Sequence, residues 1–336
     1  MNRHSGDHEQ RAQWDAVVTA LRRGQRIAIT SHIDPDPDSI GSCLAVWHGL
    51  LSLDKQPVVV MADEVPHYLR FLSGADEILT LGRGQKNLLG DDRRFDTLVV
   101  VDCEPERTGG ILPEELGDIV VVNIDHHVSN EAQVDHKVLV PQAAATAELI
   151  GQLLAQLQVP LTGESAQCLL AGLIGDTGSF AYGNTTPETH RFAAQLLEVG
   201  ANSEEIHQQL FETVPFEFPG MLCRVLQRLH RSDDGRVAWI EIPLELVTKM
   251  KEIQMESERI VRYARMIQGV EVAALIREIA PGVCKVSLRS KAEVDVSQVA
   301  ASLGGGGHRK AAGCTVTANL DETRDRVLAA IDQFMD

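Results

Sequence analysis

Four side chains that could bind a divalent cation alternate along one short stretch near the N-terminus: His32, Asp34, Asp36 and Asp38. Asp34 and Asp36 each precede a proline, which disfavours the helical region, so we expect an extended run whose alternate side chains share one side. Carboxylates gathered in this way resist ionising beside one another, and a bound divalent cation removes that cost. The alternative is an acidic turn that leads into a helix, with Asp38 or Ser39 as its N-cap.

Acidic and imidazole groups recur at three later points. Asp102 ends an apolar strand, where it could bridge two metals or be a simple turn residue. In Asp125-His126-His127, consecutive side chains of an extended segment diverge, so we expect His126 to bind metal and His127 to contact a substrate phosphate. The alternative is one satisfied buried histidine and one solvated histidine. Asp176 lies between two glycines and is either a helix-terminal turn residue or the last carboxylate of a metal pair.

A glycine run followed by a histidine, Gly304 to Gly307 and then His308, stands out in the C-terminal part of the chain. Such a run could be a flexible linker. Successive small residues also let the backbone approach a ligand and direct its N–H groups at an anion. His308, with Arg289 and Lys310 as candidates nearby and Ser290 at a strand end, could line that pocket.

The elements that would position the first three clusters are near-continuous apolar strands, typical of a sheet covered on both faces. Helical segments alternate with them, which predicts a parallel α/β sheet. Ligands of such sheets bind beyond the carboxyl ends of the strands, where three of the four clusters fall. The expected strands are Arg26–Thr30, Val58–Met61, Asp96–Val101 and Ile119–Ile124, and the expected helices are 10–23, Ser39–Leu53, Thr146–Leu157, Glu164–Ile174, Pro187–Val199 and Ser203–Phe211.

The rest of the chain predicts a second, smaller domain that begins after the turn Ser232–Arg236. Met221–His230 is expected to be a connecting helix, and another helix is expected near 244–266. The expected strands of this domain are Val237–Ile242, Val270–Arg277, Val283–Arg289 and Cys314–Val316.

The bulk composition is that of a soluble globular protein, with 336 residues, 44% hydrophobic and 24% charged. This length favours two domains. A net charge of −17 predicts repulsion of long nucleic acids and of anionic membranes. We expect a cytoplasmic location, because the first ten residues lack a signal-peptide core, no apolar run is long enough to span a membrane, and the six cysteines form no Cys-x-x-Cys pair.

The candidate ligands offer oxygen and nitrogen without sulfur, which suits Mn²⁺ or Mg²⁺ better than structural zinc. Two such cations about 3.5–4 Å apart can stabilise the attacking and leaving oxygens of an in-line displacement at phosphorus, and they lower the pKa of a bound water. No side-chain nucleophile is then required. The sequence contains no Gly-x-Ser-x-Gly elbow, no P-loop and no convincing dinucleotide fingerprint.

Together these motifs resemble those of the DHH phosphoesterases: His32-x-Asp34-Pro35-Asp36-x-Asp38-Ser39, Asp102, Asp125-His126-His127 and Asp176. Gly304 to His308 resembles the glycine motif of their DHH-associated domain. The likeness covers roughly residues 10 to 334, with the motifs in family order. Within the family, the chain looks like the bacterial nano-RNases that also act as phosphatases on 3′-phosphoadenosine 5′-phosphate (pAp).

The resemblance implies an α/β fold in three parts. Residues 1–200 would form a DHH catalytic, metal-binding domain, in which helices flank a mainly parallel sheet. Residues 201–232 would form a helical linker. Residues 233–336 would form a smaller α/β DHH-associated domain with a mixed sheet, which binds substrate.

The resemblance also implies two divalent metal ions, with Mn²⁺ favoured and Mg²⁺ or Co²⁺ as alternatives. His32 and Asp36 would hold one ion, and the other would be held by Asp38, His126 and Asp176. Two residues would be catalytic: Asp102, which would bridge both ions, and His127, beside the scissile phosphate. The nucleotide would be contacted by Arg289, Ser290, Gly305, Gly306, Gly307 and His308. No ligand role is carried over to Asp34, whose position varies in the family.

The expected activity is degradation of very short RNA oligonucleotides, such as pGpG and pApA, together with dephosphorylation of pAp to AMP. With only 4% aromatic residues and an acidic surface, the chain offers neither a long base-stacking channel nor a track for a phosphate backbone. The alternatives are a soluble phosphodiesterase for cyclic di-AMP or pApA, and a catalytically silent nucleotide-binding module. By analogy we expect a homodimer and no membrane partner.

Overall fold

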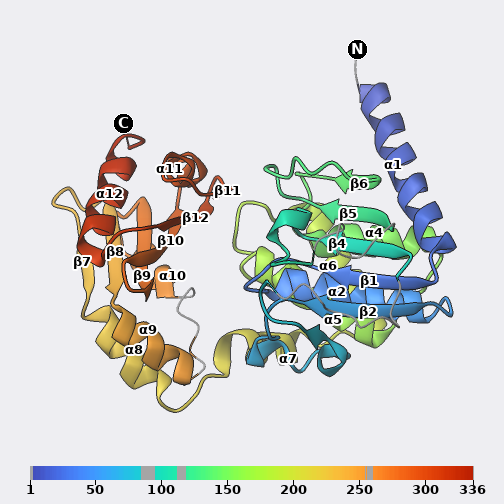
Figure 1. Ribbon diagram of the computed structural model, residues 1–336, viewed down its shortest axis with the longest axis horizontal. Helices are drawn as coiled ribbons and strands as arrows, with labels where there is room; N and C mark the ends of the chain where they lie inside the picture. The colour runs from blue at the N-terminus through green and yellow to red at the C-terminus, as the bar shows by residue number, and fades with distance from the viewer. Residues whose placement is uncertain (1–2, 85–94, 112–118, 254, 256–259, 336) are drawn as a thin grey trace. The chain divides into compact units, whose positions relative to one another are not determined.

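The computed structural model describes residues 3–84, 95–111, 119–253, 255 and 260–335. The chain divides into two compact units, Met1–Thr213 and Val214–Asp336, which are coloured blue to yellow and yellow to red in Figure 1. The division falls inside the segment 201–232 that the sequence predicts to be a linker. Each unit has its own sheet and its own hydrophobic core, and each is described by itself.

The sheet of the first unit consists of six parallel strands in the order β3-β2-β1-β4-β5-β6 (Figure 1). This confirms the predicted parallel α/β sheet, although the sequence did not predict β3 and β6. Because all the strands run in one direction, their carboxyl ends lie at one edge. Their bounds are β1 (Arg26–Thr30), β2 (Gln56–Met61), β3 (Leu79–Thr80), β4 (Thr97–Val101), β5 (Val120–Asp125) and β6 (His136–Leu139).

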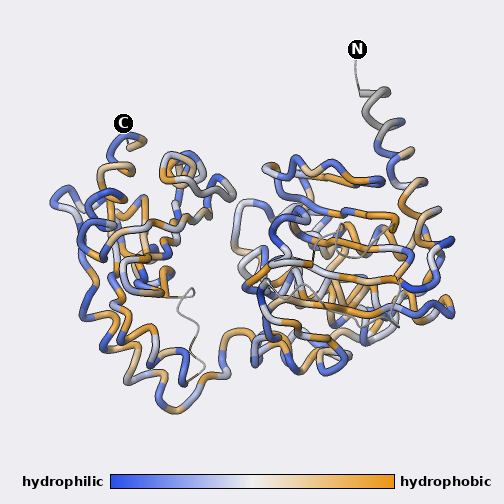
Figure 2. The backbone as a smooth tube through the Cα atoms, viewed as in Figure 1, coloured by the Kyte–Doolittle hydropathy of each residue, from blue (hydrophilic) through white to orange (hydrophobic). Residues whose placement is uncertain are grey.

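The helices of the first unit bury one side of this sheet in the largest hydrophobic cluster, whose apolar segments are orange in Figure 2. They are α1 (Arg3–Arg23), α2 (Pro37–Leu51), α4 (Thr146–Leu157), α5 (Gly163–Asp176), α6 (Pro187–Val199) and α7 (Ser203–His207). The segment predicted as one helix over Ser203–Phe211 is divided, because α7 is followed by a π-helical turn, Gln208–Glu212. Short 3₁₀ turns are His67–Leu69, Ala75–Glu77 and Pro105–Arg107.

Glycines determine how closely α2 and α5 pack. A Cβ atom at Gly41 would lie 2.3 Å from the backbone oxygen of Cys168, and one at Gly172 would lie 2.8 Å from Oδ1 of Asp38. Glycine within a helix costs roughly 0.5–1 kcal/mol relative to alanine, so the close approach of the two helices is the reason for it here. This packing places the first turn of α2 against the last turns of α5.

The second unit contains a mixed sheet in the order β11-β12-β10-β9-β8-β7, in which only β8 and β9 pair in parallel among the strands described. This confirms the predicted mixed sheet. The strands are β7 (Leu229–Arg231), β8 (Val237–Ile242), β9 (Val272–Ala280), β10 (Val283–Ser290), β11 (Gly306–His308) and β12 (Ala311–Val316). The helices are α8 (Phe218–Leu226), α9 (Leu244–Glu252), α10 (Val261–Arg265), α11 (Val296–Ser302) and α12 (Leu320–Asp332).

Three predictions for this unit change in detail. The connecting helix expected over Met221–His230 is α8, which ends at Leu226, and Leu229–Arg231 form β7 instead. The helix expected near 244–266 is represented by α9 and α10, and residues 254 and 256–259 between them lie outside the described residues. The glycine run is not a flexible linker, since Gly306 to His308 form β11 and pair with β12. Among the described helices, none combines the length and the apolar character that crossing a membrane would require.

We predict that Gly41→Ala destabilises the first unit by about 1–3 kcal/mol, because the added methyl group cannot fit against the Cys168 carbonyl. Gly163→Ala is the matched control, since a Cβ atom there has no neighbour within 4 Å. It should change stability by no more than about 0.5 kcal/mol. Urea denaturation of both variants measures the difference, and equal stability would contradict the packing described for α2 and α5.

Candidate metal centre

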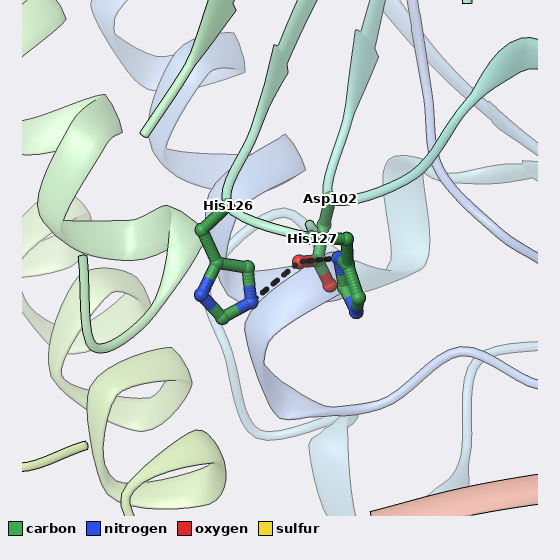
Figure 3. Close-up of side chains that lie close together, drawn as sticks. All are labelled: Asp102, His126 and His127. Carbon is green, nitrogen blue, oxygen red and sulfur yellow. Dashed lines mark ion pairs between the residues drawn. The ribbon is translucent and has the colours of Figure 1, made fainter. Parts of the chain in front are cut away.

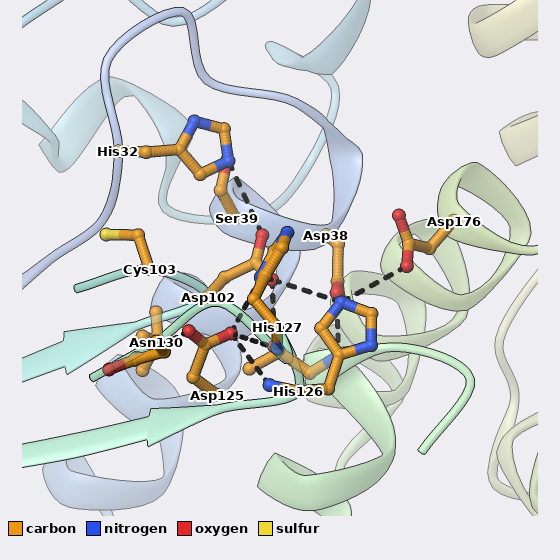
Figure 4. A network of polar contacts seen from close by, with 12 residues as sticks. His32, Asp38, Ser39, Asp102, Cys103, Asp125, His126, His127, Asn130 and Asp176 are labelled. Carbon is orange, nitrogen blue, oxygen red and sulfur yellow. Dashed lines mark hydrogen bonds and ion pairs between the residues drawn. The ribbon is translucent and has the colours of Figure 1, made fainter. Parts of the chain in front are cut away.

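Side chains from separate elements converge at the carboxyl edge of the first unit's sheet (Figure 4). His32 follows β1, Asp102 follows β4 and His126 follows β5. Asp38 lies in the first turn of α2, and Asp176 is the last residue of α5. Their ligand atoms, with those of two further residues, form three overlapping groups within 4.8 Å: His32–Asp36–Asp102, Asp38–His126–Asp176 and Asp102–His126–His127.

The first group depends on a helix cap. Oδ1 of Asp36 accepts a hydrogen bond from the N–H of Ser39 at 2.9 Å and caps α2, while Oδ2 lies 3.7 Å from Nε2 of His32. The cap of α2 is therefore Asp36, and not Asp38 or Ser39 as in the alternative of an acidic turn. Asp36 can cap the helix and belong to the cluster at the same time, because its carboxylate uses one oxygen for each contact.

Asp34 is the exception to the predicted alternation. Its φ of +54° is left-handed rather than extended. Its Oδ1 pairs with the guanidinium of Arg83 at 2.6 Å, and its N–H donates to Asp63 at 2.7 Å. Arg83 also binds Asp63 at 2.6 Å, so these three residues hold the loop that carries His32 and Asp36. The expected extended run is thus broken at Asp34, because its ion pair with Arg83 and the hydrogen bond from its N–H to Asp63 outweigh the local preference before proline.

Asp102 lies at the centre of the cluster. It is 2% exposed and has a φ of +62°, a conformation that aspartate adopts more readily than most residues. Oδ2 is 3.4 Å from Nε2 of His32, and Oδ1 is 3.7 Å from Nε2 of His126. Oδ1 also accepts a hydrogen bond from the hydroxyl of Thr146 at 2.8 Å. Both carboxylate oxygens of Asp102 therefore face a histidine from a different group.

The second group is held by the N-terminus of α4. The N–H groups of Thr146 and Ala147 donate to Asp38 at 2.7 and 2.9 Å, so Asp38 caps this helix from a distant part of the chain. Nε2 of His126 lies 3.4 Å from Oδ2 of Asp176. These contacts bring α2, α4, α5 and the end of β5 to one point.

The tautomers of His32 and His126, two of the three histidines beside Asp102, follow from their backbone contacts. Nδ1 of His32 lies 2.8 Å from the carbonyl of Ile33, and Nδ1 of His126 lies 3.1 Å from the carbonyl of Ala143. A carbonyl only accepts, so Nδ1 carries the hydrogen in both rings and Nε2 faces the carboxylates. This is the arrangement that metal-binding histidines commonly have.

His126 and His127 do not diverge as the sequence predicts. Their rings lie 4.7 Å apart, edge to face, and Figure 3 shows both beside Asp102. β5 ends at Asp125, so the two histidines lie beyond the strand. Their side chains therefore need not point to opposite faces as consecutive strand residues do. Oδ1 of Asp125 lies 2.8 Å from Nδ1 of His127, and Nδ2 of Asn130 donates to Oδ2 of Asp125 at 2.6 Å.

The carboxylates in this cluster repel one another, and burial adds to the effect for Asp38, Asp102 and Asp176. Burial raises the pKa of Asp38 well above its ordinary value, and neighbouring carboxylates raise it further. Burial likewise raises the pKa of Asp176 to about 7, with Asp102 and Asp36 adding to the shift. Burial would also raise the pKa of Asp102, but its hydrogen bond with His32 and the nearby imidazoles lower it. Without a cation, the pKa values of these carboxyl groups therefore differ, since those of Asp38 and Asp176 are raised and that of Asp102 is lowered.

The pKa values of two histidines in the cluster, His32 and His127, are raised by the neighbouring carboxylates. Burial opposes the protonation of His32, but the contacts with Asp102 and Asp36 outweigh it and raise its pKa to about 9. For His127, burial is outweighed by Asp125 and Asp102, and the pKa again rises to about 9. In the absence of another cation, protons therefore supply the positive charge that these carboxylates require.

The donor set fits two divalent cations. The first two groups contain only imidazole nitrogen and carboxylate oxygen, which suit Mn²⁺ or Mg²⁺. Together they contain four carboxylates, Asp36, Asp38, Asp102 and Asp176, whose charge two divalent ions would balance. Asp102 belongs to the group of His32 and to a group that contains His126, the position required of a bridging ligand.

The residues predicted to bind nucleotide lie in the second unit. The Ser290 hydroxyl is buried and donates to the carbonyl of Val294 at 2.7 Å, and Nη1 of Arg289 donates to the carbonyl of Leu288 at 2.9 Å. Gly305 and Gly307 have a packing role as well, because a Cβ atom at either would lie within 3 Å of β12. Their contact with nucleotide, and that of Gly306 and His308, stays a prediction.

Sequence reasoning missed the residues that support the cluster. Thr146 and Asn130 act only through tertiary contacts, and Asn184 donates to the carbonyls of Ala144 at 2.8 Å and Asp176 at 3.2 Å. Only the position of Asn184 could have drawn attention to it, because this polar residue follows Asp176 closely, in a turn before α6. Nothing in that position indicates which carbonyls the amide binds.

The fold and the cluster define a class of two-unit α/β proteins with a parallel sheet that carries acidic and imidazole groups at its carboxyl edge. The model of the DHH family N-terminal domain matches residues 26–173, and the DHHA1 domain model matches residues 246–336. A relative from Thermus thermophilus, named bifunctional oligoribonuclease and PAP phosphatase NrnA, is 34% identical over 311 residues, which cover 91% of this chain and 89% of the relative. The chain belongs to the DHH family.

Other relatives and a solved structure extend this similarity. The bifunctional oligoribonuclease and PAP phosphatase NrnA of Bacillus subtilis is 25% identical over 94% of this chain and 96% of its own length. The cyclic-di-AMP phosphodiesterase PdeA of Listeria monocytogenes is 26% identical over 95% of this chain but only 49% of its own length. The crystal structure of an exopolyphosphatase-related protein from Bacteroides fragilis is 26% identical, covers 96% of both chains and has a TM-score of 0.86.

We predict that Asn130→Ala destabilises the first unit by about 2–4 kcal/mol. The buried amide donates to Asp125 and to Asn123, and its loss leaves two buried oxygens without that donor. Gln133→Ala removes a similar amide from an exposed position and should change stability by no more than about 0.5 kcal/mol. Denaturation curves of the metal-free variants measure both values, and a neutral Asn130→Ala would contradict the structural role of this network.

Proposed function

We propose that the protein is a phosphoesterase that depends on two divalent metal ions, with Mn²⁺ favoured, and that it hydrolyses very short RNA oligonucleotides and pAp. The observation that carries this proposal is the placement of Asp102 between His32 and His126, with four carboxylates gathered around two imidazoles. The names of the Thermus and Bacillus relatives support the substrate class.

The metal ligands in this proposal are His32, Asp36 and Asp102 at a first position, and Asp38, His126, Asp176 and Asp102 at a second. Bound divalent ions would lower the pKa of water and neutralise charge on the phosphoryl oxygens. The Nδ1–H groups of His32 and His126 donate to carbonyls, which fixes both rings with Nε2 toward the ions. Thr146 and α4 hold the shared and second carboxylates in place.

His127 has a different role in this proposal. Asp125 holds its Nδ1 and favours the protonated ring, and Asn130 fixes Asp125 in turn. A protonated imidazole beside Asp102 would donate a hydrogen bond to an oxygen of the scissile phosphate and stabilise negative charge on it. Arg289, Ser290, Gly305, Gly306, Gly307 and His308 are proposed to bind the nucleotide from the second unit.

A second candidate is hydrolysis of cyclic di-AMP or its linear product pApA, which the similarity to the Listeria phosphodiesterase favours. A silent nucleotide-binding module is a weaker candidate, because the donor set for both metal positions is present.

A substrate panel tests the proposal. In Mn²⁺, we expect rapid turnover of pAp and pGpG, and little attack on a 24-residue RNA, because the net charge of −17 repels a long phosphate backbone. Including pApA and cyclic di-AMP separates the second candidate, which predicts that these two are the best substrates. Preferential degradation of the long RNA would reject the length preference, and binding without turnover of any substrate would indicate the silent module.

We predict that Asp102→Asn lowers turnover of pAp by about 10³-fold or more, since it weakens binding at both metal positions and removes the equivalent of roughly 4 kcal/mol. Asp54→Asn is a matched control, because Asp54 is exposed and has a similar left-handed φ of +55°. It should retain full activity. Substantial turnover by folded Asp102→Asn protein would refute the bridging role.

We predict that Mn²⁺ affinity rises with pH up to about pH 9. The pKa of His32 is raised to about 9 in the metal-free protein, so its ring is protonated at neutral pH and must lose that proton to bind metal. For each proton that the metal displaces, the Mn²⁺ affinity should rise by about tenfold per pH unit. Calorimetric titration in buffers of different ionisation enthalpy measures the protons released. An affinity independent of pH between 6 and 9 would contradict this coupling.

A further inference from the structure

One short backbone segment, residues 143–147, forms hydrogen bonds with three ligands of the second metal position, Asp38, Asp102 and His126. Its N–H groups at Thr146 and Ala147 hold both oxygens of Asp38 at 2.7 and 2.9 Å. The hydroxyl of Thr146 holds Oδ1 of Asp102 at 2.8 Å. The distance between the second position's carboxylate and the shared carboxylate is thus set by the placement of this segment.

The same segment fixes the imidazole of the second position and the loop of its last carboxylate. The carbonyl of Ala143 accepts from Nδ1 of His126 at 3.1 Å. The next carbonyl, of Ala144, accepts at 2.8 Å from Nδ2 of Asn184, and the same amide reaches the carbonyl of Asp176 at 3.2 Å. Asn184 therefore joins the end of α5 to the segment on which Asp38 and His126 depend.

The segment has one further side-chain support. Glu148, in the first turn of α4, accepts a hydrogen bond from the N–H of Ala144 at 3.0 Å. Ala145, the N-cap residue, offers no side-chain acceptor to the helix, so α4 begins on contacts from elsewhere in the chain. Side chains thus bind both the N–H and the carbonyl of Ala144. Glu148 binds the N–H, and Asn184 binds the carbonyl and also contacts Asp176 at the end of α5.

The first metal position has a different support. The loop with His32 and Asp36 is held by Arg83 and by the two carboxylates it binds, Asp34 and Asp63. None of the contacts described for Asn184 involves this loop. A change at Asn184 should therefore act on one position and leave the other intact.

We propose that Asn184 is a positioning residue that sets the metal affinity of the second position separately from the first. The inference rests on the proposed two-metal function. Supporting residues of metal ligands typically change affinity by about 10–100-fold, and we expect Asn184→Ala to weaken the second Mn²⁺ by that factor. The first Mn²⁺ should bind as in the wild-type protein, so its retention also reports that the variant is folded.

The test is Mn²⁺ titration of the metal-free full chain, followed by electron paramagnetic resonance. Wild-type protein should show a spin-coupled pair at two equivalents. Asn184→Ala should show one uncoupled Mn²⁺ and require about 10–100-fold more metal for coupling. Asn202→Ala is the matched control, because Asn202 caps α7 and has no described contact with the cluster. It should match the wild type.

Double variants identify which position is weakened. Adding Asp176→Ala to Asn184→Ala should weaken the second Mn²⁺ further and leave the first Mn²⁺ bound, because both residues act on one position. Adding Asp36→Ala should remove the remaining Mn²⁺, because it acts on the other. Unchanged two-metal binding by Asn184→Ala, or equal weakening of both positions, would overturn the inference while leaving the proposed function standing. Failure of wild-type protein to bind two Mn²⁺ ions would instead overturn the proposed function.

Discussion

The repulsion between four carboxylates at one edge of a sheet is the constraint on which the rest of the first unit depends. Asp38 and Asp102 are almost fully buried, and Asp176 and Asp36 lie beside them. Ionised groups in such a place are unstable unless cations or donors compensate them. The raised pKa of Asp176 and of His32 shows protons in that compensating role, and two divalent ions would take it over.

The scaffold makes this costly arrangement possible through backbone contacts rather than through more charge. α4 directs two N–H groups at Asp38, and a backbone carbonyl orients His32 and another orients His126. Glycines such as Gly172 let the helices approach, and the left-handed backbone at Asp102 occurs where β4 ends. The hydrophobic core of the first unit packs these helices and strands against one another.

Residue type and position in the chain were enough to predict the sheet and the cluster. Apolar runs that end in Asp102 and Asp125 indicate parallel strands with polar ends, and the structure brings their side chains together. Alternation failed at Asp34, because its ion pair with Arg83 is a tertiary contact that no local rule anticipates. Asn130, Thr146 and Asn184 were missed for the same reason. Short strands such as β6 and β11 carry too few residues for a clear pattern.

The proposed function requires two metal ions that share the carboxylate of Asp102. Anomalous diffraction at the manganese edge, from crystals grown in Mn²⁺, measures this directly. We predict two peaks about 3.5–4 Å apart. One peak should lie beside His32 and the other beside His126, with the carboxylate of Asp102 between them. A single peak, or peaks away from Asp102, at a Mn²⁺ concentration that supports hydrolysis would contradict the two-metal site.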